Sequence, residues 1–316
     1  MWYARGLWPP VCFLLASGSV EAQTVFHNDG NVVHVSAGAV VYVQGSVNNL
    51  NDGRLDNGGT FHFTADWTSN TAVSDDADAL PGTFVLAGVR QDLTGARDIG
   101  FPSVRLRESV RRVVQRNSDV SVAGTLALAE AEWATRSHRC SVTNADPAAV
   151  TRGAGGYVSS DSIGGALVRR TDRVEPYLYP VGSTGGTHRT PEKRFRPVYL
   201  TPVAPAENDF AVRFANVDPS DDDTAPGVTG FDAEARNPAL TEINRAYYFN
   251  IDRERGETPV DVAIYYPVAD GKFSTVAQRQ ETGVWEDARG EVEPNVAPPA
   301  HTDVFDRVAL LFGHDD

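Results

Sequence analysis

The chain has little of what helical, membrane-spanning or disulfide-stapled proteins need. Its 316 residues include two cysteines, one methionine and two lysines, Lys193 and Lys272. Beyond the first residues it has no long apolar run, which argues against a protein with several membrane spans. Glycine (28) and proline (19) are frequent, and valine and threonine outnumber the helix-favouring methionine and lysine. This composition predicts an all-β fold.

Acidic residues outnumber basic ones by 42 to 28, which gives a formal net charge of -14. The excess is uneven: residues 23–175 carry 14 basic and 17 acidic side chains (-3), and residues 176–316 carry 13 and 24 (-11). A nucleic-acid backbone or an anionic lipid surface would be repelled at long range. We therefore expect no nucleic-acid partner and a solvated acidic surface, with an acidic ligand-binding surface as the alternative.

The first 22 residues predict an export signal. Arg5 precedes an apolar stretch from Leu7 to Ala16, and Val20-Glu21-Ala22 places small residues where a signal peptidase cuts. The stretch is too short to persist as a spanning helix. We expect cleavage after Ala22 and a chain that does not span the membrane.

Cleavage would also remove Cys12 and leave Cys140 as the single thiol. One thiol cannot form an internal disulfide. A nucleophile or a metal ligand is the chemical alternative, since His138 is two residues away, but the sequence offers no third partner nearby.

Residues 23–175 predict a β-solenoid or β-roll-like region. Short alternating runs recur at Val33-His34-Val35, Val41-Tyr42-Val43 and Phe61-His62-Phe63, separated by Asn, Asp and Gly clusters at 48–53 and 56–59 that tolerate positive φ. Apolar positions 33, 41, 50, 55 and 61 recur every six to nine residues. This spacing fits a meander of hairpins or stacked solenoid coils, and we favour the solenoid.

The segment from Arg105 to Arg116 is ambiguous. Leu106, Val110, Val113 and Val114 lie at helical spacing, which alone would indicate an amphipathic helix. We favour strand, because strand-like runs flank the segment on both sides.

Residues 176–316 predict a second region, a β-sandwich. Eight short candidate strands with turn residues between most of them are typical of that fold. They are Tyr177–Val181, Pro197–Pro202, Phe210–Ala215, Ala246–Ile251, Val260–Tyr266, Phe273–Gln278, Gly283–Asp287 and Arg307–Phe312.

Several sequence segments resemble those of exported surface proteins of Bacteroidetes-type bacteria, which use the type IX secretion and gliding machinery. The stretches that carry the resemblance are Val40–Asn49 with Leu55–Thr60 and Trp67, Asp119–Leu128, and the joining segments Gly156–Gly165, Tyr179–Ser183 and Phe195–Leu200. The resemblance implies a non-catalytic β-rich module of an adhesin or its accessory subunit, at or beyond the outer membrane. The C-terminal sorting domain that many such proteins carry is not evident in the residues up to Asp316, so periplasmic retention or export with a partner stays open.

Candidate binding residues include aromatic side chains of both regions. Trp285 is the candidate for stacking on a polysaccharide, with Trp133 and Trp67 as further aromatics. Glu286 and Asp287, which follow Trp285, are the best local pair of carboxylates for glycoside cleavage, although their acidic neighbours favour a solvated hairpin.

Calcium is the most credible metal. Asp218, Asp221, Asp222 and Asp223 concentrate carboxylate oxygens on one loop, as a hard divalent cation requires. A weaker cluster is Asp75, Asp76 and Asp78. The alternative for both is a charged surface loop, and we expect no other cofactor.

Three functions follow from these observations. The first is a secreted or cell-surface structural or adhesive protein, in which the solenoid is a rigid spacer and the sandwich docks an outer-membrane or cell-surface protein. The second is a secreted carbohydrate-binding module. The third is a polysaccharide-degrading enzyme, which would need a cleft with two opposed carboxylates.

Overall fold

The computed structural model describes residues 24–70, 81–184, 193–222, 231–279, 283–296 and 305–311. Strands dominate these residues, and their only helices are three single 3-10 turns, η1 (Pro147–Ala149), η2 (Pro219–Asp221) and η3 (Val268–Asp270). The all-β prediction is confirmed. No helix in the described ranges is long and apolar enough to cross a membrane.

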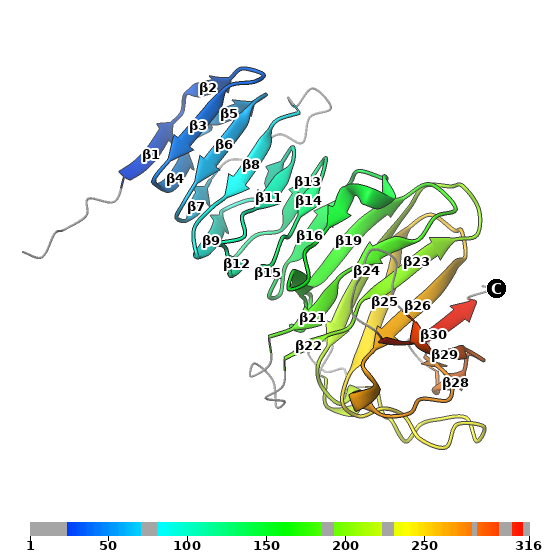
Figure 1. Ribbon diagram of the computed structural model, residues 1–316. Coiled ribbons are helices and arrows are strands. Elements are labelled where there is room, and N and C mark those ends of the chain that lie inside the picture. Colours follow the sequence, from blue (N-terminus) through cyan, green and yellow to red (C-terminus); the bar gives the residue numbers. More distant parts are fainter. Residues whose placement is uncertain are drawn as a thin grey trace, which may run out of the picture.

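The first half is a parallel β-solenoid of about seven coils (Figure 1). Its first face contains β1 (Thr24–Asp29), β4 (Gly45–Leu50), β7 (Trp67–Ser69), β9 (Arg90–Gly95), β12 (Arg112–Gln115), β15 (Glu132–Ala134), β18 (Tyr157–Ser159) and β21 (Val181–Ser183). Its second face contains β2 (Val32–Val35), β5 (Arg54–Asn57), β10 (Ile99–Phe101), β13 (Val120–Val122), β16 (Arg139–Val142) and β19 (Ala166–Thr171). Its third face contains β3 (Val40–Val43), β6 (Thr60–Phe63), β8 (Thr83–Leu86), β11 (Val104–Leu106), β14 (Leu126–Ala127) and β17 (Val150–Thr151).

Parallel pairing decides between the solenoid and the meander. Val33 lies beside Leu55 and Val41 beside Phe61, each pair in adjacent parallel strands about one coil apart. Adjacent strands of a hairpin meander would be antiparallel. The solenoid prediction is confirmed.

The polar cluster at 48–53 divides between a strand and a corner. Asn48 and Asn49 belong to β4, and the positive φ angles follow at Asn51 (50°) and Asp52 (63°). Asn49 is on the buried side of β4, and its side chain joins a hydrogen-bonded ladder inside the solenoid. The cluster therefore contributes an internal ladder as well as a turn.

The ambiguous segment is strand rather than helix, as predicted, and the structure divides it into two strands around a corner. β11 ends at Leu106, the amide of Val110 donates to the carbonyl of Arg107, and β12 begins at Arg112. Leu106, Val110 and Val113 lie on the inside of the coil and belong to the main core, whereas Val114, the next residue of β12, is buried on the opposite side of the strand. A corner of this length imitates helical spacing.

Aromatic rings stack along the core. Trp67 is fully buried and lies 5.3 to 5.6 Å, between ring centroids, from Phe63, Phe84 and Phe101. Phe26 extends the stack to the first coil through Phe61, at 5.5 Å. These contacts join consecutive coils, so each coil is stabilised by its neighbours.

Tight corners need glycine where the chain approaches the previous coil. A Cβ added to Gly88 would lie 2.0 Å from the backbone carbonyl oxygen of Thr64. That distance is impossible without backbone movement, so the coil spacing requires glycine there.

Antiparallel strands close the C-terminal end of the solenoid (Figure 1). β24 (Asn208–Ala215) and β25 (Tyr248–Arg255) extend the second face from β19, and β22 (Arg194–Phe195) pairs with β21 on the first face. A five-stranded antiparallel sheet contains β20 (Tyr177–Tyr179), β23 (Val198–Pro202), β26 (Val260–Tyr266), β30 (Phe305–Leu311) and β29 (Glu291–Val296). β27 (Ala277–Gln278) and β28 (Glu286–Asp287) form a separate pair.

The separate β-sandwich predicted for residues 176–316 is not confirmed. One hydrophobic cluster contains solenoid residues such as Val47 and Trp133 together with Tyr177, Phe214 and Val262 of the antiparallel sheets. The second face itself passes from parallel to antiparallel strands at β19. The core is therefore continuous across residue 175, where the sequence predicts a boundary.

Candidate functional site

The first coil is the open end of the solenoid. Within the described residues, β1, β2 and β3 each pair on one side only, with β4, β5 and β6. In Figure 1 these strands lie at the end of the molecule farthest from the antiparallel sheets. Their unpaired backbone groups can form hydrogen bonds with another extended chain.

Apolar side chains surround and fill this open end. Phe26, Val33 and Val41 point into the core but are only half-buried, whereas Val47 and Phe61 beside them in the second coil are fully buried. The outward-pointing apolar residues are more exposed still: Val25 by 47%, Val32 by 67%, Val40 by 68% and Tyr42 by 57%.

A buried asparagine in this coil has an unpartnered oxygen. Nδ2 of Asn28 donates to Oδ1 of Asn49 at 2.8 Å and to the carbonyls of Asn31 (2.8 Å) and Arg54 (3.3 Å). Oδ1 of Asn28 accepts no hydrogen bond, although the residue is only 3% exposed. A buried acceptor without a donor is costly, and this atom is enclosed by the protein's own residues.

The predicted stacking residue, Trp285, lies in a small core of its own. It is 7% exposed, its ring packs at 6.5 Å from that of Phe231, and its Nε1 donates to the carbonyl of Asp232 at 3.2 Å. Trp67 and Trp133 are fully buried. A sugar-stacking platform needs an exposed ring face, and none of these three residues presents one.

The predicted carboxylate pair does not converge. Glu286 and Asp287 are successive residues of β28, so their side chains leave opposite sides of the strand. Oδ1 of Asp287 accepts from the Thr275 hydroxyl at 2.6 Å and from the Arg289 amide at 2.9 Å, and these hydrogen bonds lower the pKa of its carboxyl.

The predicted calcium loop holds its carboxylates apart. Asp218 caps η2 and contacts Arg245 at 3.2 Å, whereas buried Asp222 contacts Arg213 at 2.7 Å and accepts from Tyr248 at 2.6 Å. Asp221 is exposed. Asp223 lies outside the described residues, as do Asp75, Asp76 and Asp78. In the described part of the chain, no three His, Cys, Asp or Glu side chains gather as metal ligands would.

Cys140 and His138 lie in and beside β16. Cys140 is fully buried between Val120 and Leu167, and burial raises the pKa of its thiol. Nδ1 of His138 lies 3.5 Å from Oδ1 of Asp119. A thiol with a raised pKa is a poor nucleophile, and the environment of Cys140 is that of a core residue.

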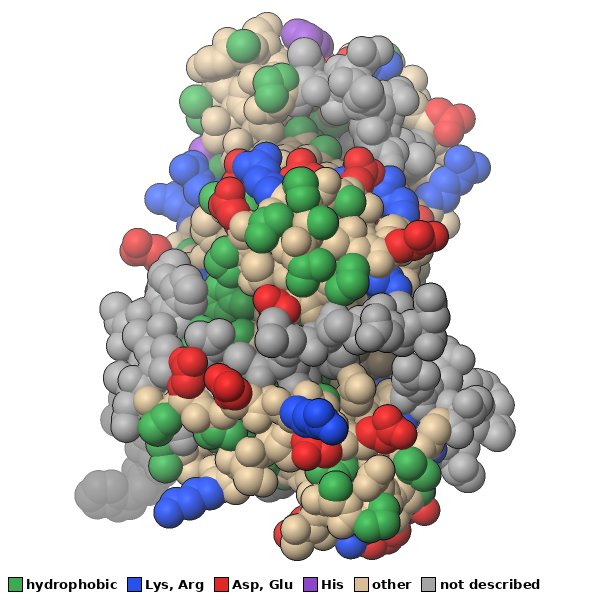
Figure 2. Space-filling model, turned by 90° about the vertical axis from the view of Figure 1, so that its right-hand side faces the viewer, with side chains coloured by type: hydrophobic (Ala, Val, Ile, Leu, Met, Phe, Trp, Pro, Cys, Tyr) green, Lys and Arg blue, Asp and Glu red, His purple; other side chains and the backbone are tan. Residues whose placement is uncertain are grey.

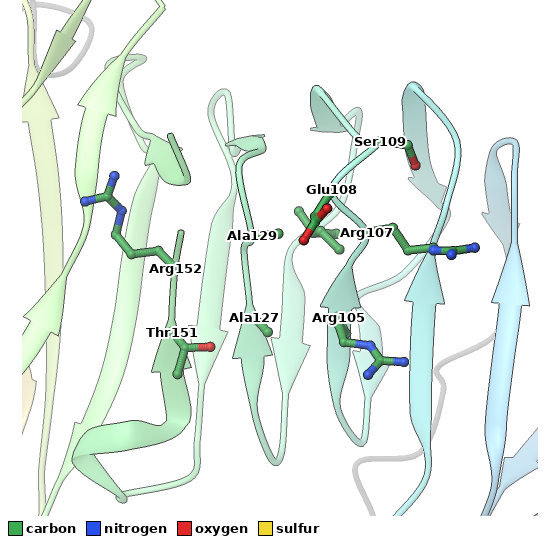
Figure 3. Close-up of a pocket in the computed structure, with 9 residues that line it drawn as sticks. Arg105, Arg107, Glu108, Ser109, Ala127, Ala129, Thr151 and Arg152 are labelled. Carbon is green, nitrogen blue, oxygen red and sulfur yellow. The ribbon is translucent and has the colours of Figure 1, made fainter. Parts of the chain in front are cut away.

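A groove of about 690 Å³ crosses the outer surface of the third face (Figure 3). Ala127 and Ala129 form its floor, and Thr151 and Glu108 lie beside them. Arg105 and Arg107 extend to one side, and Arg152 points to the other, where its guanidinium lies 4.1 Å from the Phe195 ring. The three guanidinium groups therefore do not converge on one ligand position.

The outer surface of the first face carries two buried carboxylates that the sequence analysis did not single out. Asp161 accepts from the hydroxyls of Ser183 at 2.8 Å and Ser159 at 3.4 Å. Oε2 of Glu132 lies 3.2 Å from Nε of Arg112, and burial raises the pKa of the Glu132 carboxyl. Neither residue lines the groove of the third face. Their burial depends on strand register, which the sequence does not display.

Glu132→Gln is expected to become more stable relative to the unchanged protein as the pH rises above about 4.5. The raised pKa means that the folded state favours the protonated carboxyl, so ionisation of Glu132 at higher pH destabilises the fold, and Gln removes this effect. Denaturant unfolding of both proteins across this range measures the difference. The exposed Glu175→Gln is the control for a lost charge, and a Glu132→Gln difference that is constant with pH would refute the assignment.

On the face shown in Figure 2, acidic and basic side chains are interspersed around apolar patches and form no continuous basic stripe.

A search of protein-family models, a search of curated proteins and a search of solved structures each found no match to this chain.

Proposed function

We propose that the protein is an exported, non-catalytic structural component of the bacterial cell surface. In this proposal the solenoid is a rigid spacer that separates two docking ends, and adhesion or assembly depends on a partner at the outer membrane or on another cell-surface protein. The two antiparallel sheets at the C-terminal end act as a sandwich-like closing module and as one of these docking ends.

The continuous core carries this proposal. One hydrophobic cluster extends from Val35 in the first coil to Val262 in the antiparallel sheets. A chain whose coils are joined by a single packed core transmits force along its length and resists bending, because close-packed protein interiors have low compressibility. The resemblance of several sequence segments to exported surface proteins of Bacteroidetes-type bacteria supports the cell-surface location.

Surface labelling tests the proposal. The chain has two lysines, Lys193 and Lys272, and both are exposed, so a membrane-impermeant amine-reactive biotin has two defined side-chain targets. We expect labelling of both on intact cells of the producing bacterium. The Lys193→Arg/Lys272→Arg variant, which keeps both charges, controls for labelling at the N-terminus.

Labelling that occurs only after the outer membrane is permeabilised, with a known periplasmic protein as reference, would refute the cell-surface location. The protein would then be a periplasmic component.

A further inference from the structure

We propose that the groove on the third face binds an acidic polysaccharide, whose anionic groups contact Arg105 and Arg107 on one side and Arg152 on the other. The site lies on the flank of the solenoid, between the first coil and the antiparallel strands at the C-terminal end (Figure 1). The inference goes beyond the proposed spacer role, which assigns no ligand to this surface.

Small side chains give the groove its shape. Arg105, Ala127 and Thr151 lie side by side in register on β11, β14 and β17. Adjacent strands are about 4.8 Å apart, so the backbones of Arg105 and Thr151 are about 10 Å apart. Ala127 and Ala129 place only methyl groups between them (Figure 3). The floor is therefore lower than the walls and leaves room for an extended chain.

Two arginines of the groove carry charge that the protein does not neutralise. Arg105 and Arg107 are exposed, and neither forms an ion pair within the part of the chain that the structure describes. On the first face of the same coil, by contrast, Arg112 contacts Glu132 at 3.2 Å. The positive charge of this wall is therefore open to an anionic ligand.

The positive potential of this wall reaches the neighbouring coils. His62 lies in register with Arg105 two strands away, with Val85 between them. Burial and the positive charges of Arg107 and Arg105 lower the pKa of His62. The two guanidinium groups thus act on a side chain outside the groove, as charges without a nearby counter-ion do.

The groove is locally positive in an acidic protein. Its lining contains three arginines and one acid, Glu108, a local charge of +2 in a chain of net charge -14. The nearby carboxylate of Glu130 accepts a hydrogen bond from the amide of Gly155 at 2.5 Å. At physiological ionic strength charges are screened beyond about 8 Å, so the groove's own arginines dominate the attraction of a bound chain.

The arrangement of the lining favours a polysaccharide over a small anion. The guanidinium of Arg152 is held by the carbonyls of Ala154 and Gly156 and by the Phe195 ring, away from Arg105 and Arg107. One phosphate or carboxylate cannot contact both walls, whereas a chain with anionic groups on several units can.

The lining also fits sugar better than nucleic acid or peptide. None of the described residues that line the groove is aromatic, although single-stranded nucleic acids are usually bound by stacking of their bases. A peptide strand adds to a free sheet edge, but β11 and β14 are paired on both sides. The hydroxyls of Ser109 and Thr151 and the carboxylate of Glu108 are suitable hydrogen-bonding partners for sugar hydroxyls.

Binding of defined oligosaccharides to the purified full chain is the test. The probes are an oligogalacturonate, which carries carboxylates, and a heparin oligosaccharide, which carries sulfates as well. Isothermal titration calorimetry should detect binding of at least one of them, weakened by added NaCl, and no binding of neutral dextran. The tighter probe identifies the preferred anionic group.

A matched pair of double variants locates the site. Arg105→Gln/Arg107→Gln should weaken binding at least about fivefold, because two ion pairs are lost. Arg97→Gln/Arg253→Gln removes the same charge from exposed positions outside the groove and should bind like the unchanged protein. Equal weakening by the two double variants would overturn the proposal, since only the total charge would then matter.

Ala127→Leu tests the shape of the groove without changing its charge. The outward, half-buried side chain would fill the floor and should also weaken binding at least about fivefold. Thermal unfolding of each variant reports whether the fold is kept. Unchanged binding by a folded Ala127→Leu protein would overturn the assignment to this groove.

Three further results would overturn the proposal. They are no binding of either charged oligosaccharide, equally tight binding of single-stranded DNA, and equally tight binding of poly-aspartate. Surface labelling of Lys193 and Lys272 is independent of all these measurements, so failure here leaves the spacer role standing.

Discussion

Trp67→Ala is expected to lower the free energy of unfolding by about 3–5 kcal/mol, the range for removing a large aromatic side chain from a packed core. Trp67 is fully buried, and its ring contacts Phe63, Phe84 and Phe101, which lie on three different coils. The cavity would open where these coils meet. Denaturant unfolding measures the total loss, and hydrogen exchange shows whether the first coils unfold before the rest.

Phenylalanine substitutions separate ring packing from hydrogen bonding. Nε1 of Trp67 is buried without a partner, so Trp67→Phe loses no hydrogen bond and should cost less than Trp67→Ala, because it leaves a smaller cavity. Nε1 of Trp133 donates to Oε1 of Gln115 at 2.7 Å, so Trp133→Phe should cost about 1–3 kcal/mol more by leaving that acceptor unpaired. Equal costs for the two variants would contradict this assignment.

Arg169→Met is expected to lower the free energy of unfolding by about 3 kcal/mol or more, because one buried and two partly buried carbonyls would lose a charged donor. Arg169 is fully buried in β19, where the parallel strands give way to antiparallel ones. Its guanidinium donates to the carbonyls of Leu178 (2.8 Å), Asp146 (3.0 Å) and Pro147 (3.1 Å). Burial lowers the pKa of Arg169 to about 10.

The adjacent Arg170→Met is the matched control. Arg170 is half-buried and contacts Asp209 at 3.1 Å and Glu207 at 3.7 Å, so its loss should cost less than about 1 kcal/mol. Thermal or denaturant unfolding of both variants gives the comparison. If Arg169→Met were as mild as Arg170→Met, the guanidinium would not hold the last coils to the antiparallel sheets.

The sequence predicted the solenoid because each coil repeats simple rules. Alternating apolar residues define the inside of a strand, and Asn, Asp and Gly mark the corners. For the segment around Val110 and Val113, whose spacing fits a helix, the strand-like neighbours were enough to predict strand. The boundary at residue 175 could not be predicted, because antiparallel strands that close a solenoid show the same alternation as those of a sandwich.

The candidate sites were harder to predict than the fold. Trp285 and the aspartates of the 218–223 loop were chosen by residue type, but burial and pairing with arginine are properties of the folded chain. The asparagine ladder in the first coils was missed for a different reason. Asn28 and Asn49 are one coil apart, at a spacing of 21 residues, and that spacing identifies a ladder only when the coil length is known.

Amide hydrogen exchange of the free, full chain tests the central claim most directly, namely that one continuous core is closed at its C-terminal end and open at its first coil. We expect the amides of β12 and β15 to exchange slowest, those of β24 to be protected at the closed end, and those of β1, β2 and β3 to exchange much faster. Protection of β1, β2 and β3 equal to that of β12 and β15 would contradict the account.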